Sequence, residues 1–149
     1  MNGKYFLDTD IILCSFDKSD QRKSKIATQL IKKALEQHSG CISNQVVQEF
    51  LNVATKKFSV PLTASDSKMY LSKVLAPLCQ VFTDIDLYMR SVDIMERWQY
   101  SLYDSMIIAA ALQAECSVIY SEHLQDQQVI HDATVINPFV QKKLRHIHE

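Results

Sequence analysis

Short apolar runs alternate with longer amphipathic segments along this chain, and this alternation restricts the possible folds more than any other feature. The runs that predict strands are Lys4–Leu7, Cys41–Ser43, Val81–Thr83, Ser117–Ser121 and Thr134–Ile136. The segments with apolar residues at helical spacing are Asp20–Gln37, Gln45–Lys57, Thr63–Leu75, Asp86–Trp98 and Tyr103–Glu115. Strands that alternate with helices are typical of an α/β domain, with a mostly parallel central sheet flanked by helices.

Four local signals mark where these segments begin and end. Gly40 fits the C-cap of the first helix, and Asn44 and Thr63 fit the N-caps of the next two. Pro77 is expected to end the helical pattern that starts at Thr63, because proline lacks the N–H that a helix interior needs.

Length and composition predict one ordinary domain over residues 1–149. The 149 residues are 47% hydrophobic and 22% charged, with a net charge of -1, so global charge gives no argument for a nucleic-acid partner. The longest apolar run, Met106 to Leu112, is too short to cross a bilayer, and the N-terminus lacks the apolar core of a signal peptide. We therefore expect a cytoplasmic protein, whose four scattered cysteines are free thiols.

Four acidic residues follow predicted strands or begin the elements after them. They are Asp8, Glu49, Asp104 and Glu122. Because ligands of parallel sheets bind outside the carboxyl ends of the strands, these carboxylates are predicted to converge. A local explanation is open for each acid: Asp8 and Asp10 suit a turn, and Asp104 suits a capping box with Ser101.

A cluster of carboxylates without imidazole or thiolate favours Mg²⁺ or Mn²⁺ over zinc. Such ions lower the pKa of bound water and neutralise charge on a phosphodiester, so the cluster predicts metal-dependent hydrolysis of phosphodiester bonds.

Three segments resemble the motifs of the PIN domain family, in the family's order. They are FLDTDIIL with Asp8, VVQEFLNV with Glu49, and LYDSMIIAAAL with Asp104, and the end of the chain, VIYSEHLQDQQVI followed by VINPF, resembles the single-domain toxins of VapBC toxin–antitoxin pairs. The resemblance implies a single PIN-like domain, an α/β/α sandwich, with Mg²⁺- or Mn²⁺-dependent endoribonuclease activity. It also implies a homodimer, and inhibition by a VapB-like antitoxin that inserts an arginine into the acidic pocket.

Two positions depart from the family pattern. His123 stands where the family usually carries an aspartate, so the fourth acid is expected to be Glu122, with Asp126 as the alternative. Asp10 stands where many relatives carry asparagine, and it aids metal binding or only forms a turn.

Basic residues that suit phosphate contacts lie in three places: Lys18, Arg22, Lys23 and Lys25; Lys56 and Lys57; and Lys142, Lys143 and Arg145. The alternative is that they are solvated helix faces and terminal charges. His146-Ile147-His148 is interpreted as part of a terminal tail rather than as a metal site.

Two other functions fit parts of the sequence. A haloacid-dehalogenase-like phosphatase would use Asp8 as nucleophile and Asp10 as general acid, but the chain lacks that family's later Gly-Asp-x-x-x-Asp motif. A non-catalytic PIN fold that binds RNA or a protein is the second alternative, and His123 in place of an acid supports it. The RNA cleaved and the antitoxin are not specified by the sequence.

Overall fold

A computed structural model gives the fold of the protein and describes residues 3–140. In chain order the elements are β1 Lys4–Leu7, α1 Thr9–Cys14, α2 Gln21–Gln37, β2 Gly40–Ser43, α3 Asn44–Lys56, α4 Ala64–Tyr70, the π-helical turn η1 Leu71–Leu75, α5 Ala76–Leu78, β3 Cys79–Val81, α6 Ile85–Trp98, α7 Leu102–Gln113, β4 Cys116–Tyr120, β5 Val129–Ile130 and β6 Ala133–Ile136. Residues 142–149, with their basic side chains and the two histidines of the predicted tail, lie outside the described residues.

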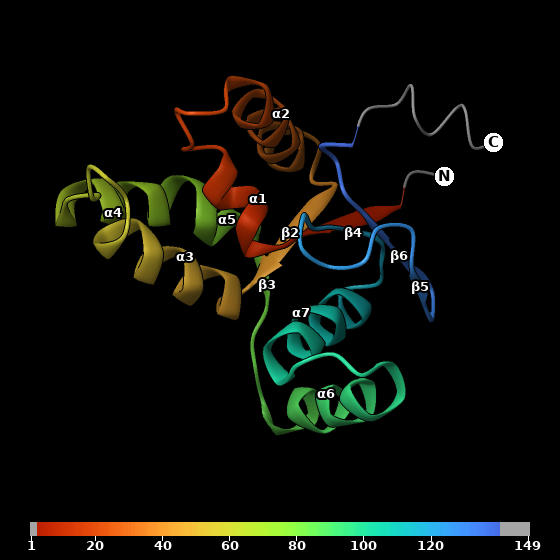
Figure 1. The fold of residues 1–149 in the computed structure, drawn as a ribbon. Helices are drawn as coiled ribbons and strands as arrows, with labels where there is room; N and C mark the ends of the chain where they lie inside the picture. Colours follow the sequence, from red (N-terminus) through yellow and green to blue (C-terminus); the bar gives the residue numbers. More distant parts are fainter. Residues whose placement is uncertain (1–2, 141–149) are drawn as a thin grey trace.

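The strands form one sheet in the order β3-β2-β1-β4-β6-β5, with α2 and α7 on opposite faces (Figure 1). All neighbouring strands are parallel except β5, which runs antiparallel to β6. The predicted α/β class, with a mostly parallel sheet between helices, is therefore confirmed. Because β1 lies between β2 and β4, the residues that follow β1 and β4 meet at one edge of the sheet.

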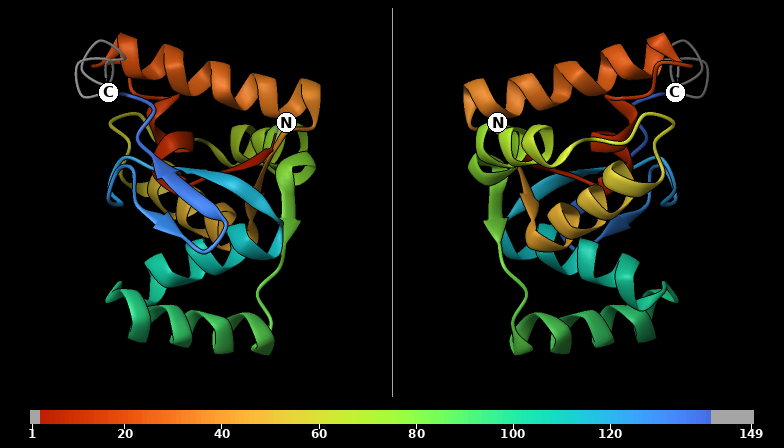
Figure 2. Two further views of the ribbon diagram at one scale, coloured as in Figure 1. Left: turned by 90° about the vertical axis from the view of Figure 1, so that its right-hand side faces the viewer. Right: turned by 90° about the vertical axis from the view of Figure 1, so that its left-hand side faces the viewer.

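Helix α7 is enclosed on several sides. It packs on the sheet, and α6 covers its outer side, so α6 is the outermost helix on that face (Figure 2). Seven consecutive residues, Ser105 to Ala111, are consequently buried. This burial explains why the middle of this segment has no polar face in the sequence. Asp104 immediately precedes the buried stretch.

Some expected boundaries were wrong. Helix α2 ends at His38 in a left-handed conformation, whereas Gly40 begins β2. A Cβ on Gly40 would lie 2.6 Å from the Ala34 Cβ, so this glycine serves close packing rather than a helix cap. The N-cap of α3 is Ser43, and Asn44 instead accepts hydrogen bonds from the backbone and hydroxyl of Thr83.

Two further expectations fail at helices. Thr63 caps α4 as predicted, but the helical chain continues past Pro77 through η1 into α5. Pro77 lies in the first turn of α5, just after the wider turn at Leu71–Leu75, and a missing N–H is tolerated in the first turn of a helix. The stretch after Asp8, expected to be a turn and a loop, is the short helix α1.

Among residues 3–140, those other than glycine with a positive φ are His38, Gln99, Glu115, Gln127 and His131. His38 and Gln99 end α2 and α6, where glycine is the usual residue. Within residues 3–140, all four cysteines are free, and no helix has the length and apolarity needed to cross a membrane.

Candidate active site

A pocket of about 340 Å³ opens at the edge of the sheet where β1 and β4 end. Its lining residues are Asp8, Thr9, Asp10, Leu13, Gln45, Glu49, Asn52, Val53, Tyr103, Asp104, Ile107 and His123. They come from α1, α3, α7 and the segment after β4. Three of the four acids predicted from the sequence therefore line one cavity.

Asp8 is the most deeply buried of these acids, with only 2% of its surface exposed. It directly follows β1 and is the N-cap of α1, where its Oδ1 accepts the Thr9 N–H at 2.7 Å. The Ser121 hydroxyl, directly after β4, donates to its Oδ2 at 2.8 Å. Two neighbouring strand ends thus fix this carboxylate in one orientation.

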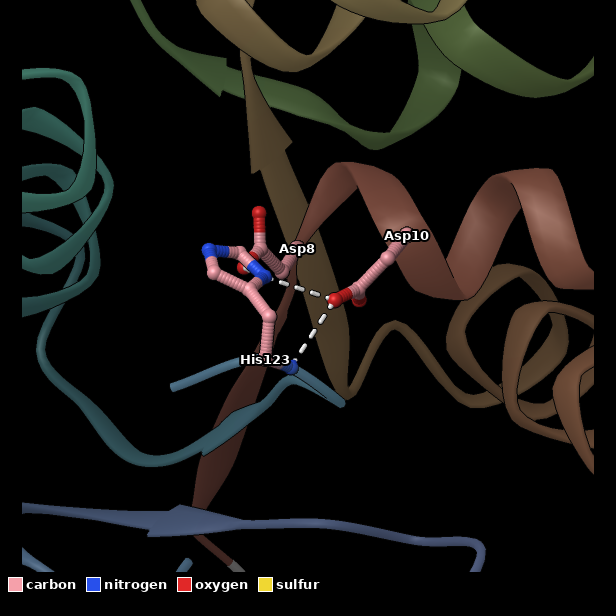
Figure 3. Close-up of side chains that lie close together, drawn as sticks. All are labelled: Asp8, Asp10 and His123. Atoms are coloured by element: carbon pink, nitrogen blue, oxygen red, sulfur yellow. Dashed lines mark hydrogen bonds and ion pairs between the residues drawn. The ribbon is translucent and has the colours of Figure 1, made fainter. Parts of the chain in front are cut away.

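Asp10 holds the segment after β4 against α1. Its Oδ2 accepts the backbone N–H groups of Glu122 and His123 at 3.1 and 3.2 Å, and it lies 2.8 Å from His123 Nδ1 (Figure 3). Its Oδ1 is buried and has no hydrogen-bond partner among the described residues. A buried carboxylate oxygen without a partner is costly, so this atom is free to take a ligand.

His123 bridges two acids from different helices. Its Nε2 lies 2.9 Å from Asp104 Oδ1, while its Nδ1 faces Asp10 and also lies 3.4 Å from Asp8 Oδ2. Ser101 caps α7 by accepting the Asp104 N–H, which is one half of the capping box considered from the sequence. Since carboxylates accept hydrogen bonds, both ring nitrogens of His123 are placed as donors.

Glu49 lies on the side of the pocket formed by α3. The Thr9 hydroxyl donates to its Oε1 at 2.6 Å, and the Gln45 side chain donates to its Oε2 at 3.1 Å. The same Gln45 nitrogen lies 3.1 Å from the Tyr103 carbonyl oxygen. These bonds connect α3 to α1 and to the start of α7, and so define the shape of the pocket.

The structure does not bring Glu122 into this cluster. Its carboxylate forms an ion pair with Lys23 and accepts a weak hydrogen bond from the Cys14 thiol at 3.8 Å. The alternative acid, Asp126, is also absent from the pocket lining and accepts the Asn137 N–H at 2.7 Å. The side chain that enters the pocket from this segment is His123.

Burial and charge shift the pKa values of two pocket residues in opposite senses. Burial, and next the neighbouring Asp10, raise the pKa of Asp8 to about 7, although His123, Ser121 and Thr9 oppose the shift. Hydrogen bonds to Asp10 and then Asp104 raise the pKa of His123 to about 11. Near neutral pH, His123 is therefore an imidazolium and Asp8 titrates.

The pocket residues fit a divalent metal ion. One ligand atom from each of Asp8, Asp10 and His123 lies within 4.8 Å of the others. The unpartnered Asp10 Oδ1 and the excess of carboxylates supply the hard oxygen donors that such ions need. The imidazole changes the donor set from the all-oxygen site expected from the sequence.

Comparison with known families agrees with this fold and pocket. The sequence model of the PIN domain family matches residues 5–126, so the chain belongs to the PIN domain family. No curated protein sequence matches the chain.

Solved structures with the same fold include several toxins. A toxin–antitoxin complex from Klebsiella pneumoniae has 20% sequence identity and a TM-score of 0.67, and the alignment covers 91% of this chain and 98% of that one. A VapC toxin of Mycobacterium tuberculosis that cleaves the sarcin-ricin loop has 19% identity, a TM-score of 0.60, and coverages of 79% and 88%. A DNA-bound VapBC of Salmonella typhimurium has 18% identity, a TM-score of 0.61, and coverages of 89% and 96%. At these identities the likeness concerns the fold.

Proposed function

We propose that this protein is a Mg²⁺- or Mn²⁺-dependent endoribonuclease and the toxin of a type II toxin–antitoxin pair. The observation that carries the proposal is the convergence of Asp8, Asp10, Glu49 and Asp104 in one pocket at the edge of the parallel sheet. Membership of the PIN domain family supports a nuclease over the phosphatase alternative. The cytoplasmic location expected from the sequence stays a prediction.

The pocket residues suit hydrolysis of a phosphodiester. A divalent cation held here would supply Lewis-acid chemistry, by activating water and offsetting charge on the phosphate. Burial and Asp10 disfavour the ionised form of Asp8, so a cation held here would offset the cost of its negative charge. In the metal-free pocket, His123 carries positive charge among the carboxylates and so reduces their mutual repulsion. Glu49 and Gln45 hold the α3 side of the pocket in place.

A groove of about 900 Å³ beside the pocket supports an extended substrate. The groove and the pocket share Asp10 and Leu13, so they lie side by side. Lys18 and Lys57 line the groove together with the aromatic ring of Phe58. Lysines that track phosphates and aromatic rings that stack on bases are the usual means of binding single-stranded RNA. Of the predicted basic residues, Lys18 and Lys57 are therefore the ones we assign to RNA contact.

Two of the other predicted basic residues already have partners within the chain. Lys23 pairs with Glu122, and Arg22 donates to the Phe139 carbonyl oxygen at 2.7 Å. We therefore assign them to the fold rather than to RNA.

Two protein partners belong to the proposal. The solved complexes with the same fold include antitoxins, which supports an antitoxin for this chain. An arginine of that antitoxin suits the carboxylate pocket, because guanidinium pairs with two carboxylate oxygens at once. The second partner is another copy of this chain.

An exposed apolar stripe on α6 supports the homodimer. Ile85, Tyr88, Met89 and Val92 recur at helical spacing and are exposed, whereas Leu87, Ser91 and Ile94 are the buried residues of the helix. The stripe belongs to the outermost helix of this face (Figure 2), and its side chains are exposed. Its four side chains expose on the order of 500 Å², a large part of the roughly 800 Å² that each partner buries in a standard interface.

Cleavage of total cellular RNA by the purified protein tests the enzymatic proposal. We expect cleavage with Mn²⁺, none with chelator, and none with Asp8→Asn or Asp104→Asn. Asp126→Asn is the matched control, because it removes a carboxylate charge outside the pocket lining. If no condition gives cleavage while circular dichroism reports an intact fold and Mn²⁺ does not bind, the protein is instead a non-catalytic binding module.

A further inference from the structure

His123 differs in chemistry from the other polar residues that line the pocket. The other candidate ligands are carboxylates, whereas His123 offers imidazole nitrogens and projects from the segment that follows β4 (Figure 3). Half of its side-chain surface is exposed, so the ring borders the open side of the cluster rather than the core. A nitrogen donor among oxygens alters which metal ions a site prefers.

The donor atoms around His123 are spaced as the ligands of one ion would be. Nδ1 lies 2.8 Å from Asp10 Oδ2 and 3.4 Å from Asp8 Oδ2. An ion about 2.1 Å from two donors at right angles holds those donors about 3 Å apart. The approach of Asp8 to the same nitrogen brings a third candidate ligand within reach of one ion.

Each of these donors is held in place by groups that are not themselves candidate ligands. Asp8 receives the Thr9 N–H and the Ser121 hydroxyl, and two backbone N–H groups hold Asp10 Oδ2. Such preorganisation removes the cost of gathering three side chains when an ion binds.

The second ring nitrogen of His123 completes a recurrent metal-site arrangement. Metal-bound histidines almost always donate the N–H of the other nitrogen to a carboxylate or carbonyl, which fixes the ring orientation. His123 Nε2 lies 2.9 Å from Asp104 Oδ1, in the place of that carboxylate. Asp104 is then a positioning residue rather than a direct ligand.

We propose that Asp8, Asp10 and His123 Nδ1 bind the metal ion, that Asp104 orients His123, and that the nitrogen ligand makes the site prefer Mn²⁺ to Mg²⁺. The ion takes the place of the Nδ1 proton, as metal binding generally releases protons from its ligands. Mg²⁺ favours an all-oxygen shell of near-ideal geometry, whereas first-row transition ions accept imidazole readily. The inference rests on the metal dependence proposed above but not on RNA as substrate.

Metal binding to the purified protein tests this assignment without any activity assay. Calorimetry with Mn²⁺ and with Mg²⁺ compares wild type, His123→Asp, Asp104→Asn and the control Asp126→Asn. Pulsed electron paramagnetic resonance of bound Mn²⁺ reports a coordinated nitrogen through its ¹⁴N coupling. Circular dichroism checks that each variant is folded, and His123→Gln replaces His123→Asp if the latter is not.

We expect ¹⁴N coupling and preferential Mn²⁺ binding in wild type and in Asp126→Asn. His123→Asp should abolish the coupling and lower the Mn²⁺-to-Mg²⁺ affinity ratio about 10-fold, because an oxygen replaces the nitrogen. Asp104→Asn should keep the coupling and weaken Mn²⁺ binding about 10- to 100-fold.

Bound Mn²⁺ without ¹⁴N coupling, or an affinity ratio unchanged in His123→Asp, overturns the assignment while the proposed function stands. Absence of any Mn²⁺ binding to wild type overturns both. RNA cleavage that fails while ¹⁴N-coupled Mn²⁺ is bound overturns only the proposed function.

Discussion

Replacing Asp8 by asparagine should stabilise the metal-free protein, and by more as the pH rises. The pKa of this carboxyl is raised from 3.8 to about 7 by burial and by Asp10, so the folded protein keeps a proton that the unfolded chain has already lost. Stability is therefore lost as the pH rises from about 4 to about 7, and it is constant above that range. Asparagine has nearly the same shape and does not titrate.

The magnitude follows from the size of the shift. Three pKa units correspond to about 4 kcal/mol, and this shift already includes the opposing effect of the positive charge of His123. At pH 4.5 the penalty is only about 1 kcal/mol, because that pH is less than one unit above the ordinary pKa of 3.8. The stability advantage of Asp8→Asn over wild type should therefore grow by up to about 3 kcal/mol between pH 4.5 and pH 8. The raised pKa of His123 acts at the other end of the scale: its contribution is complete below about pH 6.5 and is lost as the pH rises through about 11.

Urea denaturation in the presence of chelator at several pH values measures this difference. Asp126→Asn, which removes a carboxylate outside the pocket lining that accepts the Asn137 N–H, serves as the control for loss of a negative charge. Saturating Mn²⁺ should reduce the difference in stability between Asp8→Asn and wild type. The ion binds folded wild type and raises its stability by about 2.7 kcal/mol at 100 times the dissociation constant. A difference between Asp8→Asn and wild type that is independent of pH, or that favours wild type at pH 8, would refute the reasoning.

Three further changes test other parts of the molecule. The double variant Lys18→Ala, Lys57→Ala should bind RNA more weakly. The slope of log association constant against log salt concentration should fall in magnitude by about 1.4, since each phosphate contact on a single strand contributes about 0.7. An unchanged slope, measured by fluorescence anisotropy, would show that RNA does not bind in the groove. Met89→Glu on the α6 stripe should convert the dimer into a monomer, as measured by analytical ultracentrifugation, whereas Asp93→Ala on the same helix should not. A monomeric wild type would contradict the proposed homodimer. Glu122→Gln should retain RNA cleavage and lower stability by less than about 1 kcal/mol, because the ion pair of the carboxylate with Lys23 is partly exposed. Loss of cleavage would restore Glu122 as the fourth acid.

Much of the fold could be predicted from the sequence, because a helix or strand with one buried face carries apolar side chains at a regular spacing. The long helices and four of the strands were located to within one or two residues. The short helix α1 was missed because its six residues, TDIILC, are too few to show a helical period. The two-residue strand β5 gives no pattern of its own, and the displacement of the α3 cap from Asn44 to Ser43 depends on a contact with Thr83 that lies far along the chain.

The candidate site was predictable in part for the same reason. Asp8, Glu49 and Asp104 lie at ends or borders of regular elements, where the direction of a side chain follows from the period, and all three line the pocket. The segment after β4 has no such period. Whether Glu122 or His123 points into the pocket depends on backbone N–H groups that Asp10 holds, and this information lies in the tertiary structure.

The left-handed residues at the helix ends have a consequence for how the protein tolerates change. A residue other than glycine in this conformation costs roughly 1 to 2 kcal/mol. Gln99 and Glu115 adopt it at exposed positions outside the pocket lining. Glycine at such positions relieves this strain, although part of the gain is offset by the greater freedom of the unfolded chain. Glycine substitutions at these two positions should therefore raise the free energy of unfolding. A variant with glycine at Gln99 and Glu115 should therefore remain folded with destabilising pocket substitutions that would unfold the wild-type protein.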